Sequence, residues 1–267
     1  MFKRTLLVIA VLLVAFIAYE WLTFPNVAAL AKEMPATTAF MEERKQELHA
    51  AGKDDTLNYQ PVPYGRISPY LRRAVLVAED NTFYEHGGID MKAMQEAIQK
   101  DWERKKITQG GSTITQQLAK NLYLSSSRNP LRKVKEYFIA RALENHLSKK
   151  RILELYLNVV EMGERVYGAE AAAQAYFHAS ASALSPQQAA LIAGCLPNPR
   201  EMNPGAPNSR LRWRQRMILS RMRRWGYVVE QLTERRPAAP PPETETVEEP
   251  PPTETTDTTQ TETTSTQ

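Results

Sequence analysis

Helix-start signals recur along the middle of this chain, whereas the alternation of apolar and polar residues that is typical of strands is almost absent. Ser68-Pro69, Asn129-Pro130 and Ser185-Pro186 each place a capping side chain before a proline, which is favoured in a first helical turn. This pattern predicts a mainly α domain. The expected helices cover residues 38–50, 69–80, 90–102, 130–147, 148–160, 167–177, 186–194 and 211–225, with another capped by Ser112.

Composition limits the class of protein. Of the 267 residues, 42% are hydrophobic and 24% are charged, as in ordinary globular chains. The single cysteine, Cys195, excludes an intrachain disulfide and any cysteine-based zinc site. Residues 25–237 lie between an apolar leader and a tail rich in Pro, Thr and Glu, and their number suits one large domain.

The leader predicts a membrane anchor. Lys3 and Arg4 precede an apolar run that ends near Phe24, about the length that spans a bilayer. The basic pair predicts a cytoplasmic N-terminus, with the body on the periplasmic or outer face of the inner membrane. The alternative is a cleaved signal peptide, but no small-x-small cleavage site directly follows the apolar run. On either interpretation the body leaves the cytoplasm.

Charge is divided unevenly between body and tail. The chain carries 34 basic and 30 acidic residues, and seven of the acids but no base lie in residues 238–267. The strongly basic body predicts an anionic partner. Nucleic acid is an unsuitable partner outside the cytoplasm, which leaves membrane lipids and phosphorylated substrates. We expect an anchor over residues 1–24, a membrane-proximal linker and helix over 25–61, a catalytic domain over 62–229 and a disordered tail over 230–267.

Glu79 is the first candidate for chemistry. It lies one turn past Val75 on the apolar stripe of its helix, so its carboxylate should face inward and lose hydration. Desolvation raises the pKa of a carboxyl group, as a general base near neutral pH requires. The alternative is a salt-bridged glutamate at a helix end. His86 shortly afterwards is more typical of a hydrogen-bonded turn residue than of a catalyst.

Two further segments suggest binding of an anion. The Gly110-Gly111-Ser112-Thr113 turn precedes a helix, whose N-terminus favours an anion, and Lys120 stands one turn beyond Gln116. A basic run around Glu136 can stabilise a departing phosphate, although such runs are often merely solvated. This run contains Arg128, Arg132, Lys133 and Lys135. The last helix carries seven arginines, which either face solvent or dock on anionic headgroups.

Five segments together resemble glycosyltransferase family 51, the glycosyltransferase domain of class A penicillin-binding proteins. The resemblance covers roughly residues 62–229, and its segments stand here in family order. They are EDNTFYEHGGID, GGSTITQQLAKN, RKVKE, ILELYLNVVEMG and AALIAGCLPNP. No SxxK, SxN or KTG box follows, so the match is to the monofunctional members. His178-Ala179 replaces the usual Gly-Lys after Tyr-Phe, and the tail is not a family feature.

The resemblance implies a mainly α, lysozyme-like fold that polymerises lipid II with inversion and releases undecaprenyl diphosphate. It implies that Glu79 is the base that deprotonates the acceptor 4-hydroxyl, and that Glu136 is a second glutamate near the donor pyrophosphate. The residues implied to hold the pyrophosphate are Lys120, Arg128, Arg132 and Lys133. Those implied to line the donor site are Ser112, Gln116 and Gln117. Supporting positions are Asp80, Phe83, His86, Gly110 and Gly111.

The chemistry of the residues fits this class. An inverting hydrolase needs one carboxylic acid and one carboxylate, whereas a diphosphate leaves without protonation when cations stabilise it. One base with a cationic cluster therefore favours a transferase. No cofactor is required, and Mg²⁺ or Mn²⁺ is an optional assistant at the pyrophosphate because no DxD-type site demands one. Expected partners are lipid II, the growing glycan strand, membrane lipids and other cell-wall synthesis or division proteins.

Two other classes stay open. A lysozyme-like peptidoglycan hydrolase would need a protonated glutamate in its cleft and would not need Lys120 or Arg128. A membrane-anchored envelope scaffold would use the tail as a spacer or tether and would not need Glu79.

Overall fold

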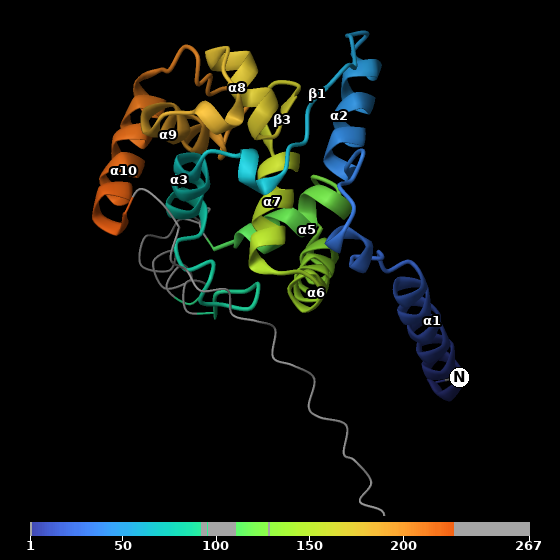
Figure 1. The fold of residues 1–267 in the computed structure, drawn as a ribbon. Coiled ribbons are helices and arrows are strands. Elements are labelled where there is room, and N and C mark those ends of the chain that lie inside the picture. Colours follow the sequence, from blue (N-terminus) through green and yellow to red (C-terminus); the bar gives the residue numbers. More distant parts are fainter. Residues whose placement is uncertain (1, 92–94, 96–110, 128, 227–267) are drawn as a thin grey trace, which may run out of the picture. The chain divides into compact units, whose positions relative to one another are not determined.

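The computed structural model describes residues 2–91, 95, 111–127 and 129–226 of the chain. Most of this part is helical (Figure 1). The α-helices are α1 (Phe2–Leu22), α2 (Ala39–Ala50), α3 (Pro69–Glu79), α5 (Ile114–Tyr123), α6 (Pro130–His146), α7 (Lys149–Val159), α8 (Ala169–Phe177), α9 (Pro186–Cys195) and α10 (Ser209–Trp225). The described residues also form short 3-10 helices, η1 (Ala28–Ala31), η2 (Tyr64–Arg66) and η3 (Ala181–Ala183).

Side-chain caps explain where several helices begin. Ser68 accepts a hydrogen bond from the Tyr70 amide at the start of α3, and Asn129 accepts one from the Leu131 amide at the start of α6. The expected cap at Ser112 is wrong, because Thr113 caps α5. The Thr113 hydroxyl accepts from the Gln116 amide, and the Gln116 side chain accepts from the Thr113 amide. This capping box requires a residue three positions before the glutamine.

A small sheet joins segments that are distant in the sequence. Its strands are β1 (Asn58–Tyr59), β2 (Glu161–Gly163) and β3 (Val166–Tyr167), in the order β1-β3-β2. β1 runs parallel to β3, and β2 runs antiparallel to it. Strands this short cannot show a recognisable alternation. One result is a difference from the helix expected over 167–177. Tyr167 belongs to β3 and Gly168 is the N-cap, so α8 begins at Ala169.

The main core lies between α3, α5, α7 and α9. α3 packs on α9, α5 packs on both α6 and α7, and α10 covers α9. Leu71, Leu118 and Tyr156 are fully buried members of this core. Val27 and Met41 belong to the same cluster, so the segment before residue 62 contributes to the core that supports the catalytic helices.

Some sequence predictions fall outside the described residues. Of the expected helix over 90–102, only residues 90, 91 and 95 are described, and all of the tail from residue 227 lies outside. Within the described part of the chain, no helix combines the length and the apolar character needed to cross a membrane.

Candidate active site

Glu79 ends α3 with its side chain turned into the protein. The helix buries Leu71 and Val75 on one face, and the Glu79 side chain follows that face with 14% of its surface exposed. Gln117 Nε2 donates to Glu79 Oε2 at 3.1 Å, and an Arg214 guanidinium nitrogen lies 3.9 Å from Oε1. Burial raises the pKa of Glu79, while Gln117 and Arg214 oppose the rise. The result is a carboxylate that binds a proton more readily than an exposed glutamate does.

Gln117 joins this carboxylate to a buried tyrosine. The Tyr156 hydroxyl on α7 donates to Gln117 Oε1 at 2.8 Å, and the amide group of the same side chain donates to Glu79. Tyr156 is fully buried. Helices α3, α5 and α7 therefore meet at the Glu79 carboxylate through two consecutive hydrogen bonds.

Asp80 and His86 hold the end of α3 against the start of α5. Asp80 Oδ1 lies 2.9 Å from His86 Nε2, and Asp80 Oδ2 accepts from the Ile114 amide at 3.0 Å. Phe83 is fully buried and meets the His86 ring edge-on. All three side chains bond or pack within the protein.

A cationic cluster forms on and near α6. Glu136 is buried and pairs with Arg132 at 2.8 Å and with Lys133. These residues stand three and four positions before Glu136, and this spacing brings them together on one face of a helix. Lys133 also donates to the Ser112 hydroxyl at 3.1 Å. Glu136 thus holds two cations beside the turn that precedes α5.

Lys120 on α5 adds a cation with a different environment. Its ammonium lies 5.0 Å from the centre of the Phe40 ring, and no carboxylate among the described residues is within ion-pair distance. Burial lowers the pKa of Lys120, and the charges of Arg132 and Lys133 lower it further, against the opposite effect of Glu136. Lys120 is therefore electrostatically coupled to the α6 cluster but is left available to an anionic ligand.

The structure does not bring all the sequence-predicted residues into the site. The Gln116 side chain caps the N-terminus of α5, where it accepts a hydrogen bond from the Thr113 amide. Gly111 is exposed at the turn before that helix, whereas Gly110 and Arg128 lie outside the described residues. Gln117 contacts Glu79 and Tyr156 through its side-chain amide.

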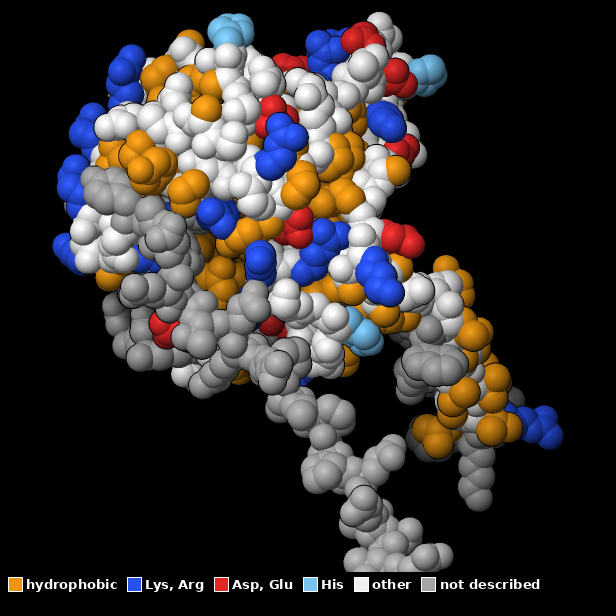
Figure 2. Space-filling view, in the orientation of Figure 1, with side chains coloured by type: hydrophobic (Ala, Val, Ile, Leu, Met, Phe, Trp, Pro, Cys, Tyr) orange, Lys and Arg blue, Asp and Glu red, His pale blue; other side chains and the backbone are white. Residues whose placement is uncertain are grey.

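The arginines of α10 divide into inward and outward groups, which the sequence did not distinguish. Arg214 reaches Glu79 and donates to the Gly194 carbonyl, while Arg221 donates to the Val77 carbonyl. Neither alternative, facing solvent or docking on headgroups, describes Arg214 and Arg221, because both side chains bond within the protein. The exposed arginines of this helix are Arg210, Arg212, Arg216, Arg223 and Arg224. Basic side chains gather on the edge of the molecule that α10 forms (Figure 2).

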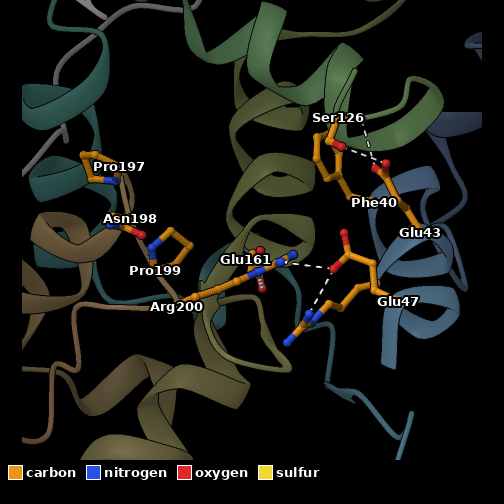
Figure 3. Close-up of a pocket in the computed structure, with 10 residues that line it drawn as sticks. Phe40, Glu43, Glu47, Ser126, Glu161, Pro197, Asn198, Pro199 and Arg200 are labelled. Carbon is orange, nitrogen blue, oxygen red and sulfur yellow. Dashed lines mark hydrogen bonds and ion pairs between the residues drawn. The ribbon is translucent and has the colours of Figure 1, made fainter. Parts of the chain in front are cut away.

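A hollow of about 300 Å³ opens between α2 and the segment after α9. Figure 3 shows Phe40 and Glu47 on one side and Arg200 on the other. Arg200 donates to Glu161 at 2.9 Å and to Glu47 at 3.1 Å. Because Phe40 also lies under Lys120, the hollow adjoins the cationic part of the site. Its residues come from separate segments, so no local sequence signal predicted it.

No group of three or more His, Cys, Asp or Glu residues in the described part of the chain is arranged to hold an ion.

A desolvated carboxylate and a cationic cluster on one helical domain are compatible with a glycosyltransferase. Comparisons with known proteins specify the family. A family model described as Transglycosylase matches residues 23–223. The chain is also similar to proteins named biosynthetic peptidoglycan transglycosylase, and three of them are compared here.

The Laribacter hongkongensis protein is 47% identical over 192 residues, which are 72% of this chain and 84% of the relative. Identity is 43% over 222 residues with the Nitrosospira multiformis protein, covering 83% of this chain and 96% of the relative. For the Methylobacillus flagellatus protein, identity is 44% over 223 residues, with coverages of 84% and 96%.

The chain therefore belongs to the transglycosylase family. Its activity is that of a peptidoglycan glycosyltransferase, which polymerises glycan strands in cell wall biogenesis. The alternatives of a hydrolase and of a non-enzymatic scaffold are thereby set aside.

Proposed function

We propose that the enzyme extends glycan strands from lipid II, with Glu79 as the general base. Glu79 takes the proton of the acceptor sugar 4-hydroxyl as this oxygen attacks the anomeric carbon of the lipid-linked strand. The bond from that carbon to the diphosphate breaks, undecaprenyl diphosphate leaves with the electron pair, and the anomeric configuration inverts. The observation that carries this assignment is the inward Glu79 carboxylate, whose pKa burial raises.

The leaving diphosphate is assigned to the cations near α6. Lys120, Arg132 and Lys133 provide charge in a partly buried region, where contacts with a phosphate are stronger than in water. Glu136 orients two of these side chains and leaves Lys120 available. Arg128 belongs to the same assignment by its place in the sequence. Mg²⁺ or Mn²⁺ stays an optional assistant at this position.

The hollow beside α2 suits the sugar rings of the strand. It presents carboxylates from Glu43, Glu47 and Glu161 and the guanidinium groups of Arg44 and Arg200. Such groups can donate to and accept from sugar hydroxyls. The Phe40 ring lines the hollow and also lies against Lys120, which supports binding of one lipid-linked glycan across both regions.

Membrane attachment is assigned to the leader and to α6. On α1, Leu6, Leu7 and Leu12 are exposed, which supports contact of this helix with the inner membrane. The basic pair Lys3 and Arg4 supports a cytoplasmic N-terminus and a catalytic domain on the outer face. Exposed apolar side chains also gather on α6, among them Val134 and Phe138, beside the cations assigned to the diphosphate.

A lysozyme-like description of the fold, a disordered tail and partner proteins of cell-wall synthesis or division stay predictions.

Polymerisation of labelled lipid II, followed by muramidase digestion of the product, tests the assignment. Glu79→Gln keeps the shape of the side chain but removes the proton acceptor, so we expect a loss on the order of 100-fold or more. Lys120→Ala should cost about 2–4 kcal/mol of transition-state stabilisation. Lys53→Ala is the matched control, since Lys53 is exposed and distant in sequence from the site. Near-normal turnover by Glu79→Gln would overturn the base assignment.

A further inference from the structure

The hydrogen bonds that end at Glu79 have a fixed direction. An ionised carboxylate only accepts hydrogen bonds, so the Gln117 side chain must turn its NH₂ group toward Glu79 Oε2. Its carbonyl oxygen then points to Tyr156, whose hydroxyl must donate. Burial raises the pKa of Tyr156 well above its ordinary value, so the hydroxyl keeps its proton throughout the working pH range.

We propose that Tyr156 is a positioning residue of the reaction: its hydroxyl locks the Gln117 carboxamide in the orientation that offers N–H, and not C=O, to Glu79. The proposal rests on the proposed function, in which Glu79 is the base. Tyr156 itself is fully buried on α7 and acts only through Gln117.

The lock has a consequence for protonation. While the amide N–H faces Glu79, it stabilises the ionised carboxylate that the reaction requires. Without the tyrosine hydroxyl, the carboxamide is free to turn over, and its oxygen can accept a hydrogen bond from the protonated carboxyl group. That second orientation stabilises the acid form and raises the pKa of Glu79 further. The fraction of enzyme with a working base then falls at low pH and recovers at high pH.

The other groups near Glu79 leave this reasoning intact. Asp80 precedes the turn after α3, Arg214 reaches in from α10, and Cys195 lies on α9. Burial raises the pKa of Cys195 to about 12, so its thiol stays neutral. Asp80, His86 beyond it and Arg214 are present in both the wild type and a Tyr156 variant, so these groups do not produce a difference between the two.

The test is the dependence of kcat on pH for Tyr156→Phe, with labelled lipid II in detergent. We expect a roughly three- to tenfold loss of kcat on the acidic side, from one lost hydrogen bond. The loss should vanish at high pH, and KM should be unchanged because Tyr156 does not reach the substrate. Tyr59→Phe is the matched control, since its half-buried hydroxyl also donates to a carbonyl, that of Pro35, away from the site. Its profile should equal that of the wild type.

A double-mutant cycle shows whether Tyr156 acts through Gln117. Gln117→Met removes the donor to Glu79, and Tyr156→Phe should then add almost no further change. Equal losses at every pH, or the same loss with and without Gln117, would mean that Tyr156 is only a packing residue. If Tyr156→Phe does not fold, 3-fluorotyrosine at position 156 keeps the shape and is a stronger donor. It should polarise the Gln117 amide and strengthen its N–H bond to Glu79. The acidic limb of the kcat profile should then move to lower pH. An unchanged limb would contradict the lock.

Failure of the proposal differs from failure of the base assignment. An inactive Glu79→Gln enzyme together with a wild-type profile for Tyr156→Phe would refute only the lock. An active Glu79→Gln enzyme would refute the base assignment and the lock with it.

Discussion

Burial and charge oppose each other at Glu79. A carboxylate loses hydration when the fold covers it, and burial accordingly raises the pKa of this group in the folded protein above its ordinary value of 4.5. Gln117 and Arg214 recover part of the cost through a hydrogen bond and a nearby positive charge. A useful proton acceptor is thus also a position at which the ionised side chain weakens the fold.

This conflict predicts that Glu79→Gln stabilises the protein as pH rises. The raised pKa means that the folded state binds a proton more readily than the unfolded state. The free energy of unfolding therefore falls as pH rises from about the ordinary value of 4.5 through the raised value. Glutamine does not titrate, so the Tm of the variant should exceed that of the wild type at neutral pH, and the difference should shrink in acid.

Thermal denaturation followed by circular dichroism over a pH series measures this effect. Glu33→Gln provides the comparison, because Glu33 is exposed. A lower Tm for Glu79→Gln at neutral pH would show that the contacts with Gln117 and Arg214 outweigh the cost of burial.

The sequence predicted the position of Glu79 but not its partners. The apolar stripe through Leu71 and Val75 is a local pattern, and it correctly indicated an inward side chain. Gln116 and Gln117 look alike in the sequence, yet one belongs to a capping box and the other contacts the base. The difference depends on how α5 packs against α3 and α7, which no local spacing records.

At the scale of elements, helix starts were more predictable than helix ends and strands. Caps such as Ser68 and Asn129 act through neighbouring amides, so their effect is local and readable. The sheet depends instead on Asn58 meeting Val166 across the fold.

α8 ends with His178 in the left-handed conformation at φ 51°, where the related family usually has glycine.

His178→Gly should stabilise the protein by about 1 kcal/mol, because a side chain makes the left-handed conformation costly and glycine adopts it freely. The measurement is the free energy of unfolding in denaturant. Ala175→Gly is the matched control, since Ala175 is exposed within α8 and glycine should destabilise a helix interior by about 1 kcal/mol. Destabilisation by His178→Gly would mean that the histidine makes a compensating contact.

At the scale of the whole molecule, the two ends of the chain should contribute differently to turnover. Residues 238–267 contain eleven threonines and seven acids without a sustained apolar pattern, so their deletion should leave catalysis intact. Deletion of residues 1–24 should reduce turnover in liposomes more than in detergent, because the substrate is itself embedded in the bilayer. Lipid II turnover by both truncated proteins in both media measures these effects. A folded but inactive tail truncation would place the tail within the working enzyme.

The segment between the leader and η2 limits how this enzyme can be recombined with its relatives. Val27, Leu30 and Met41 pack in the main core, and Arg151 on α7 donates to the Leu30 carbonyl at 2.8 Å. Phe40 lies directly against Lys120. A foreign anchor can therefore be grafted before Val27 without disturbing these contacts. A graft at residue 62 would instead replace the residues that pack in the core and against Lys120. The point at which this chain can be recombined thus lies before Val27, well ahead of α3, which carries Glu79.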